Sequence, residues 1–553
     1  MRTSKINQGL KVNAIAGTYV VTLGFDLAKT KCKGLLGFSI LRSDENGVAK
    51  FLEGMKCFAE TDPGFPAGAQ YPTNKQPIQI FQWADYSAEP GMSYYYTVTA
   101  LKGSPKNLKP FAACTVKVIT ESPEGGDQDI YFNRGTAASQ EYERRFGDLA
   151  PDKVKDNKAF EWLSRGLYEA MIAFITSCKP GKHSLRIAAY EFNYEPLLQV
   201  ISDTIKAGVD IQIIYDAKGK NPGVNNTALV TKFGLSSNST KRASFPSAIS
   251  HNKFIVKLDK NKPIAVWTGG TNFSDGGIFG HSNVAHVVEQ AATAALYLQY
   301  WEQLKKDPDN KTLPTLVEGI SSIPPLNLPK GTSVLFSPRT SLDALKYYGD
   351  LALSAKDALF MTFAFGMNKT FKDVYRNSLA PFRLALLEKK TRPYRKTDEA
   401  AKLADEQEIQ ELRNKPENIF SIGDFIRTNE FDGWVKERLT GLNGIVNYVH
   451  NKFMLIDPLS SNPIVIGGSA NFSDASTNKN DENMILVRGN KRVADIYFGE
   501  FVRLFSHFSF RESLKFRKPG NPPKPLRIDD WWETSFGDTP NSAKRKYFAQ
   551  VSK

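Results

Sequence analysis

The sequence predicts an α/β protein in which an all-β sandwich precedes two similar halves, each a mixed sheet flanked by helices. Short β-rich runs fill the first 120 residues, and strand-like and helix-like stretches alternate from about residue 137. The tetrapeptide "HNKF" occurs at 251–254 and again at 450–453, and "GGTNFSD" and "GGSANFSD" follow the two copies at similar distances. With 553 residues, the chain is also too long for one compact core.

Residues 1–120 are predicted to be all-β. The runs "TYVVTLGF", "LLGFSILRSD" and "FAACTVKVIT" are rich in β-branched and aromatic residues and are separated by turn residues. In "EPGMSYYYTVTALKG" a Pro-Gly turn is followed by residues that alternate onto one face, namely Tyr94, Tyr96, Val98 and Ala100. This strand resembles the Tyr-x-Tyr-x-Val-x-Ala strand of fibronectin type III modules. The resemblance implies a β-sandwich that binds a partner or acts as a spacer.

The two α/β halves are predicted over residues 137–310 and 331–515. After the turn-rich break "ESPEGGDQ", "SLRIAAYEF" and "VDIQIIYD" are typical of buried strands. Between them, "PLLQVISDTIKAG" predicts a helix that starts at Pro and stops at Gly. The same order recurs in "LSAKDALFMTFAFG", "VNYVHNKFMLID" and "NPIVIGGSANFS", so we expect two copies of one βαβ-containing unit. The stretch "SSIPPLNLPKG" connects them.

Two stretches stand apart from this repeat. Residues 387–418 are highly charged and predict a helical insertion in the second half. Residues 516–553 form a tail that is first Pro-rich and then aromatic, and we expect it to lie over the core.

The composition limits the location and the partners. The formal net charge of +14 favours a polyanion as partner, either nucleic acid or an anionic lipid surface. No apolar run is long enough to cross a bilayer, and no apolar region follows the basic start as in a signal peptide. Four cysteines without a CxxC pair predict neither a disulfide framework nor a zinc site. These features together predict a cytoplasmic protein.

The repeated motif is suited to binding an anion. On a strand, the histidine and lysine of "HNKF" share one face, and the fixed lysine cation disfavours a metal ion there. The Gly-Gly pair lets another backbone come close. Neutral donors follow it, namely Asn272 and Ser274 in the first copy and Asn471 and Ser473 in the second. One His-x-Lys alone is more often part of a strand edge, but two complete copies can surround a phosphate.

The motif pair resembles that of the phospholipase D superfamily, His-x-Lys-x4-Asp followed by Gly-[Gly/Ser]-x-Asn. The second copy has His450, Lys452 and Asp457 at the family's spacing, followed by Gly467, Gly468 and Asn471. The first copy has His251 and Lys253, but Asp259 comes one residue late, which weakens it as the equivalent of the family's supporting aspartate. The resemblance covers residues 137–515 and implies that both motifs meet at one active site within a single chain.

The resemblance also implies a mechanism without cofactor or metal. His251 is the expected nucleophile, which forms a phosphohistidine. His450 is the expected general acid, which protonates the leaving oxygen and then activates water. Lys253 and Lys452 hold the phosphoryl oxygens, and the family often places a carboxylate about eleven residues after the motif asparagine.

That count along the chain reaches Glu482 in the second half and Asn283 in the first. If each side chain serves the histidine of its own half, Glu482 raises the pKa of His450 and suits it to the acid role. Asn283 then leaves His251 more often neutral, as a nucleophile requires. The alternative is that both histidines are supported by groups not visible from the sequence.

Three classes of function are compatible with these residues: a nuclease, a phospholipase D that hydrolyses or transfers a lipid head group, and a binding scaffold without catalysis. Two intact His-x-Lys pairs argue against the scaffold. The clusters "EKKTRPYRK" and "AKRKYF" combine cations with tyrosine, which suits a nucleic-acid backbone and its bases, but solvated helix faces have the same pattern. The sequence favours nucleic acid as partner, with phospholipid as the alternative, and leaves the oligomeric state open.

Overall fold

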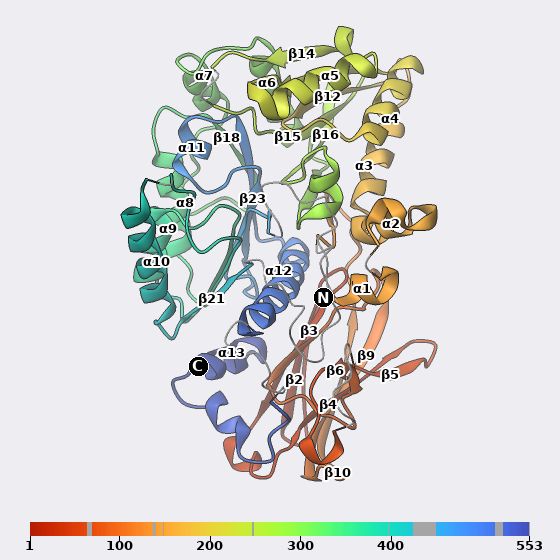
Figure 1. Ribbon diagram of the computed structural model, residues 1–553, viewed down its shortest axis with the longest axis vertical. Coiled ribbons are helices and arrows are strands. Elements are labelled where there is room, and N and C mark those ends of the chain that lie inside the picture. Colours follow the sequence, from red (N-terminus) through yellow and green to blue (C-terminus); the bar gives the residue numbers. More distant parts are fainter. Residues whose placement is uncertain are drawn as a thin grey trace.

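Two seven-stranded mixed sheets flanked by helices form the larger part of the computed structural model, and an antiparallel β region precedes them (Figure 1). The structure describes residues 1–62, 69–135, 140–147, 149–245, 248–395, 397–423, 449–514 and 524–551. The predicted fold class is confirmed. Residues 446–448 of the predicted "VNYVHNKFMLID" stretch, and most of the Pro-rich stretch 518–525, lie outside the described residues.

The N-terminal region consists of two four-stranded antiparallel sheets. The first sheet contains, in spatial order, β1 (Arg2–Asn7), β2 (Leu10–Ala16), β3 (Val21–Leu27) and β8 (Gln82–Asp85). The second contains β10 (Asn107–Ile119), β9 (Ser93–Ser104), β4 (Gly37–Asp44) and β5 (Ala49–Phe51), and a small pair is formed by β6 (Glu53–Gly54) and β7 (Tyr71–Pro72). Tyr94, Tyr96 and Val98 of β9 are buried in the core of this region. Its likeness to fibronectin type III modules stays a prediction.

The two large sheets have the same strand order. The first runs β11 (Gln128–Phe132), β17 (Val284–Val288), β16 (Lys262–Gly269), β15 (Lys253–Asp259), β12 (His183–Ala189), β13 (Asp210–Asp216) and β14 (Ser239–Arg242). The second runs β18 (Gly331–Ser337), β24 (Glu482–Arg488), β23 (Ile464–Gly468), β22 (Phe453–Ile456), β19 (Ala358–Phe363), β20 (Phe382–Leu387) and β21 (Asn418–Ile422). In both sheets the last three strands are parallel to one another and the other neighbours are antiparallel. The edge strand β11 of the first sheet precedes residue 137.

Helices cover both sheets. In the first half they are α1 (Gln140–Phe146), α2 (Lys158–Ser164), α3 (Leu167–Thr176), α4 (Glu195–Lys206), α5 (Val224–Lys232), α6 (Ala291–Lys305) and α7 (Leu313–Ile320). In the second they are α8 (Asp343–Leu353), α9 (Lys369–Asn377), α10 (Glu399–Arg413), α11 (Asp474–Asn478) and α12 (Lys491–Leu514). The charged stretch 387–418 contains α10, which connects the parallel strands β20 and β21 as α5 connects β13 and β14. No described helix has the combination of length and apolar character that a membrane span needs.

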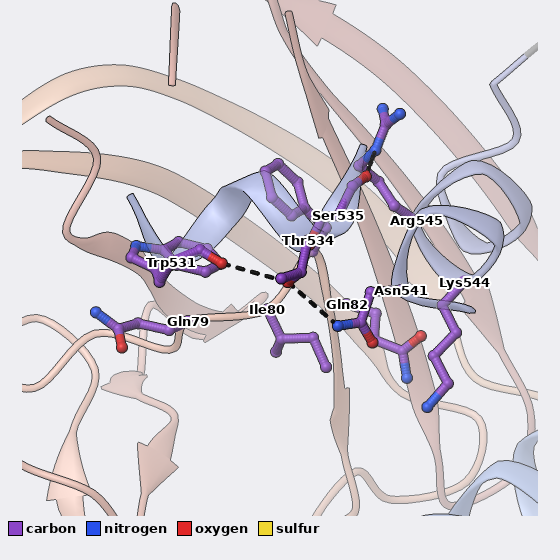
Figure 2. A pocket seen from close by; sticks show the side chains of 10 residues that line it. Gln79, Ile80, Gln82, Trp531, Thr534, Ser535, Asn541, Lys544 and Arg545 are labelled. Carbon is purple, nitrogen blue, oxygen red and sulfur yellow. Dashed lines mark hydrogen bonds between the residues drawn. The ribbon is translucent and has the colours of Figure 1, made fainter. Parts of the chain in front are cut away.

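The tail packs against the N-terminal β region. Trp531 and Trp532, in a short turn of helix at Trp531–Ser535, belong to the core of that region, and the Trp531 indole donates to the Leu35 carbonyl at 2.7 Å. Helix α13 (Pro540–Phe548) lies against β3, where a Cβ on Gly24 would be 2.1 Å from the Phe548 backbone. Figure 2 shows Trp531 and Arg545 beside a small pocket at this contact. The tail thus completes the core of a region made of the first 120 residues.

The two halves meet through residues next to the repeated motif. A β-bridge joins Ser282 to Val449, and the His450 amide donates to the Ser282 carbonyl at 3.3 Å. The Asn483 side chain donates to the Asn252 oxygen at 2.8 Å. One apolar cluster contains residues of both sheets and of α12, which also contacts β2, β11 and β21. The motifs therefore lie where the halves join.

Candidate active site

His251 is held by a carboxylate from the opposite half. Its ring Nδ1 lies 3.0 and 2.9 Å from the two carboxylate oxygens of Glu482, the first residue of β24. The Ser469 hydroxyl donates to the same carboxylate at 2.6 Å. When Glu482 is ionised, its carboxylate only accepts, so the His251 proton then lies on Nδ1 and leaves a lone pair on Nε2. His251 and Glu482 are both buried.

His450 is held by an amide, again from the opposite half. Its Nδ1 lies 2.9 Å from the Oδ1 of Asn283, a residue that directly precedes β17. The Asn283 Nδ2 donates to the Gly277 carbonyl at 2.6 Å and lies 2.9 Å from the Nδ1 of His281. The Asn283 backbone amide donates to the side chain of Asn133 at 2.9 Å, which fixes the loop that carries it.

These contacts correct the predicted partners. Counting along the chain assigned Glu482 to His450 and Asn283 to His251, and the structure shows the reverse pairing. The physical reason is that β17 and β24 begin at the boundary between the halves. Ile249 and Asp481, from opposite halves, are joined there by a backbone hydrogen bond of 3.1 Å. Glu482, the first residue of β24, and Asn283, directly before β17, therefore each reach the histidine across the boundary.

The two lysines lie beside the histidines in a buried, cationic site. Lys253 and Lys452 are each 1 % exposed, and each ammonium donates to the carbonyl of the histidine two residues before it. Burial lowers the pKa of Lys253 to about 7, although the carboxylates of Glu482 and Glu191 act to raise it. Burial, and then the Lys253 cation, hold the pKa of Lys452 well below its ordinary value. A bound phosphate would supply the negative charge that keeps both ammonium groups protonated.

The other titratable groups respond to the same burial. It raises the pKa of Glu482 to about 8, although Lys253 and the Ser469 hydroxyl act in the opposite direction. Burial and then Lys253 hold the pKa of His251 well below its ordinary value, and burial and then Lys452 do so for His450. Both rings are therefore neutral in the empty site at pH 7, and the negative charge of a substrate would favour their protonated forms.

The remaining predicted residues occupy different kinds of position. Asn272 is 2 % exposed, and Asn471 is half-buried. The side-chain oxygen of each has no hydrogen-bond partner among the described residues. Ser274 donates to Glu191 at 2.6 Å, and Ser473 caps α11.

The motif aspartates are remote from the histidines. Asp259 ends β15, so the strand rise of about 3.3 Å per residue puts it roughly 20 Å from Lys253. It pairs with Lys182 at 3.5 Å. Asp457, just after β22, accepts from the backbone amides of Lys356, Asp357 and Ala358 at 2.7–3.1 Å. Both aspartates therefore hold strand ends and do not touch the reacting groups.

Sequence reasoning missed Tyr190, Glu191, Ser469 and the contacts of His281 with Asn283 and His450. The Tyr190 ring meets the His251 ring edge-on at 4.8 Å and lies 5.0 Å from the Lys253 ammonium. Tyr190 and Glu191 directly follow β12, the strand next to β15, and residues at the ends of central strands are frequent site residues. Of the basic clusters, "AKRKYF" lies in α13, where Arg545 is 7 % exposed and pairs with Asp26. Arg545 is therefore not part of a free basic face.

Comparisons with known proteins found one matching family model and several similar solved structures. A family model described as "Cardiolipin synthase, PLD-like domain" matches residues 171–305 and 386–505, one stretch in each half. No curated protein matches the sequence. Among solved structures, phosphatidylserine synthase from Haemophilus influenzae is similar with 11% identity and a TM-score of 0.42, over 70% of this chain and 92% of that chain.

Two further solved structures are similar over other spans. Polyphosphate kinase from Porphyromonas gingivalis has 9% identity and a TM-score of 0.40, over 67% of this chain and 53% of that chain, so the match spans about half of its length. Nuc, a phospholipase D family member from Salmonella typhimurium, has 26% identity and a TM-score of 0.22, over 25% of this chain and 87% of that chain.

Proposed function

Because the chain belongs to the phospholipase D superfamily, whose members act on phosphodiesters as hydrolases or transferases, we propose that it cleaves nucleic-acid phosphodiesters through a covalent phosphohistidine. The observation that carries the proposal is the crossed pair of histidines. One has a carboxylate partner, the other an amide partner, and two buried lysines lie beside them. Two imidazoles in different settings suit a reaction that needs a nucleophile and an acid.

In the first step, the Nε2 lone pair of His251 attacks phosphorus, and the bond from phosphorus to the leaving oxygen breaks. The imidazole becomes cationic, and the Glu482 carboxylate at Nδ1 stabilises that charge. His450, protonated when the anionic substrate is bound, gives its Nε2 proton to the leaving oxygen. In the second step His450 takes a proton from water, the water oxygen attacks phosphorus, and the phosphorus–nitrogen bond breaks to restore His251.

The observed partners bear directly on which histidine is which. Partner basicity alone, applied to the crossed pairing, would make His251 the acid. The reaction favours the other assignment, because the nucleophile gains a positive charge and the acid loses one. A carboxylate at His251 stabilises the charge that forms, and an amide at His450 does not oppose release of its proton.

Lys253 and Lys452 would hold the non-bridging phosphoryl oxygens, with the amides of Asn272 and Asn471 as neutral donors. In this role the ammonium groups supply the positive charge that a metal ion supplies in other phosphodiesterases. Activity should therefore be unchanged by EDTA.

Nucleic acid is the proposed substrate on the strength of the net charge of +14 and of the Tyr190 ring, which lies beside the Lys253 ammonium and offers a face for a base. Phospholipid is the alternative, because the matching family model is described as a cardiolipin synthase domain. The His251→Ala protein separates them without turnover. For about five phosphate contacts, log K for single-stranded DNA should fall against log salt with a slope of roughly −3.5.

A flat salt response with DNA, together with binding to phosphatidylcholine or anionic vesicles and head-group release by the intact enzyme, would favour the phospholipid alternative. The covalent step has its own test. Intact protein quenched during turnover of a phosphorus-labelled substrate should carry label on His251. Label on His450 would reverse the assignment, and complete loss of activity in EDTA would contradict the metal-free mechanism.

A further inference from the structure

A third histidine lies against the proposed acid. The ring centroids of His281 and His450 are 4.4 Å apart, and the planes are tilted by 41°. Each ring presents its Nδ1 to the carboxamide of Asn283, His450 to the oxygen and His281 to the nitrogen. Because each ring turns its Nδ1 toward the carboxamide of Asn283, the Nε2 edge of each ring points away from Asn283.

The hydrogen bonds of Asn283 fix the proton positions on both rings. The Gly277 carbonyl only accepts, so the amide atom 2.6 Å from it is the NH₂ group. Its second hydrogen points at the Nδ1 of His281, which must therefore be the unprotonated nitrogen. His281 then carries its proton on Nε2. Burial and then Lys452 lower the pKa of His281 to about 3, so the ring stays neutral at pH 7.

We propose that His281 is a further catalytic residue, which donates a hydrogen bond from Nε2 to the leaving oxygen beside His450. This inference rests on the proposed function. A leaving alkoxide has more than one lone pair, so it can take the His450 proton and accept from His281 at once. A neutral donor suits this place, because a second cation 4.4 Å from His450 would oppose its protonation.

The role implies a preference for leaving groups that develop much negative charge on oxygen. A sugar or glycerol hydroxyl leaves as a poor, strongly charged alkoxide, and a donor aimed at its oxygen has a large effect. A p-nitrophenolate spreads its charge into the ring, so the same donor matters less. Loss of His281 should therefore discriminate between these two kinds of substrate.

Two variants separate the two ring nitrogens. His281→Asn keeps a polar atom near the Nδ1 position, which can accept from Asn283, and loses the donor at Nε2. His281→Gln keeps a donor near the Nε2 position and loses the Nδ1 contact. We expect His281→Asn to lower kcat by about 10²-fold for a dinucleotide with an alcohol leaving group, and by less than about 3-fold for a p-nitrophenyl diester. His281→Gln should retain at least tenfold more of the dinucleotide activity.

A second measurement does not depend on turnover. The protein has six histidines, so ¹⁵N-histidine spectra of the intact protein, with His281→Phe to assign the signal, report the tautomer. A proton on Nε2 and no titration above pH 5 are expected. A proton on Nδ1, or an equal loss on both substrates with no recovery in His281→Gln, would overturn the role of His281 alone. Failure of the wild-type protein to cleave either substrate would instead overturn the proposed function and this role with it.

Discussion

The two halves have the same strand order and a similar motif, and beside the histidines they differ at one pair of equivalent positions. Before β17 the first half has Asn283, and at the start of β24 the second has Glu482. Each of these residues serves the histidine of the other half. The comparison teaches that duplication supplied a symmetric frame, whereas the chemistry depends on one asymmetric pair. Neither half contains a complete histidine–partner unit.

The largest expected effect comes from removing either of the two motif histidines. His251→Ala and His450→Ala should each lower kcat by roughly 10⁶-fold, and the double variant should be no worse, because the two residues act as a unit. Initial rates on a nucleic-acid substrate measure this. An additive loss in the double variant, or a single variant within tenfold of wild type, would contradict the two-histidine reading.

Making the halves alike should have the next largest effect. Glu482→Gln gives His251 an amide partner, as His450 already has, and removes the carboxylate that stabilises the cationic intermediate. We expect kcat to fall about 10³- to 10⁴-fold, as when the carboxylate of a hydrolase triad is removed. The matched control is Ser469→Ala, which removes one hydrogen bond to Glu482 and should cost about tenfold.

The same variant distinguishes the roles of the halves. Because Glu482 supports the nucleophile in our assignment, a p-nitrophenyl leaving group should not rescue Glu482→Gln. Rescue by that better leaving group would show that the carboxylate supports the acid step, and the roles of the two halves would then be exchanged.

The pH dependence of kcat/KM should report the two buried charged groups, Lys253 and Glu482. Lys253, with a pKa of about 7, binds a phosphate only when protonated, so kcat/KM should fall above that value. Glu482, with a pKa of about 8, supports His251 only when ionised, so kcat/KM should fall below that value. The expected pH profile of kcat/KM is a narrow bell with its maximum between pH 7 and 8. Because Lys253 and Glu482 interact, the two apparent pKa values of the bell belong to the pair of residues together. Lys253→Arg should move the alkaline limb above pH 9, because arginine stays charged; a flat profile would contradict this assignment.

The smallest effect concerns the motif aspartates. Asp457→Asn weakens a carboxylate that accepts three backbone amides, so the free energy of unfolding should fall by about 1–3 kcal/mol. Asp259→Asn disturbs a half-exposed pair with Lys182 and should change it by less than about 0.5 kcal/mol. Urea midpoints measure the difference. Activity should stay within about threefold in both variants, and a hundredfold loss in either would give the aspartate a catalytic role.

The sequence predicted the parts of the fold that local patterns determine. The apolar residues after each "HNK" mark β15 and β22 as buried strands, and the repeated order of motifs predicts two similar sheets. The edge strand β11 was missed, because its five residues gain their strand character from pairing with β17, more than 150 positions later. A short strand of this kind has a weak local signal.

The site was predicted as a set of residues and not as a set of contacts. Spacing located Glu482 and Asn283, because each lies at or directly before the start of a strand that follows the motif at a fixed distance. Which histidine each one reaches depends on how the two sheets face each other, and a count along the chain holds no information on that. The proton position of His281 depends on contacts in the same way, because the Gly277 carbonyl orients the Asn283 carboxamide that contacts His281.

The packing of the tail has a consequence for synthesis. The Trp531 indole bonds to Leu35 across 496 positions, so the β region leaves the ribosome long before its core can be completed. At about 5–20 residues per second, the interval is roughly 25–100 s. During translation, the apolar surface that Trp531 and Trp532 later cover is open to chaperones or to other nascent chains. Shortening the chain before residue 531 should therefore yield a β region that aggregates, although every one of its own strands is present.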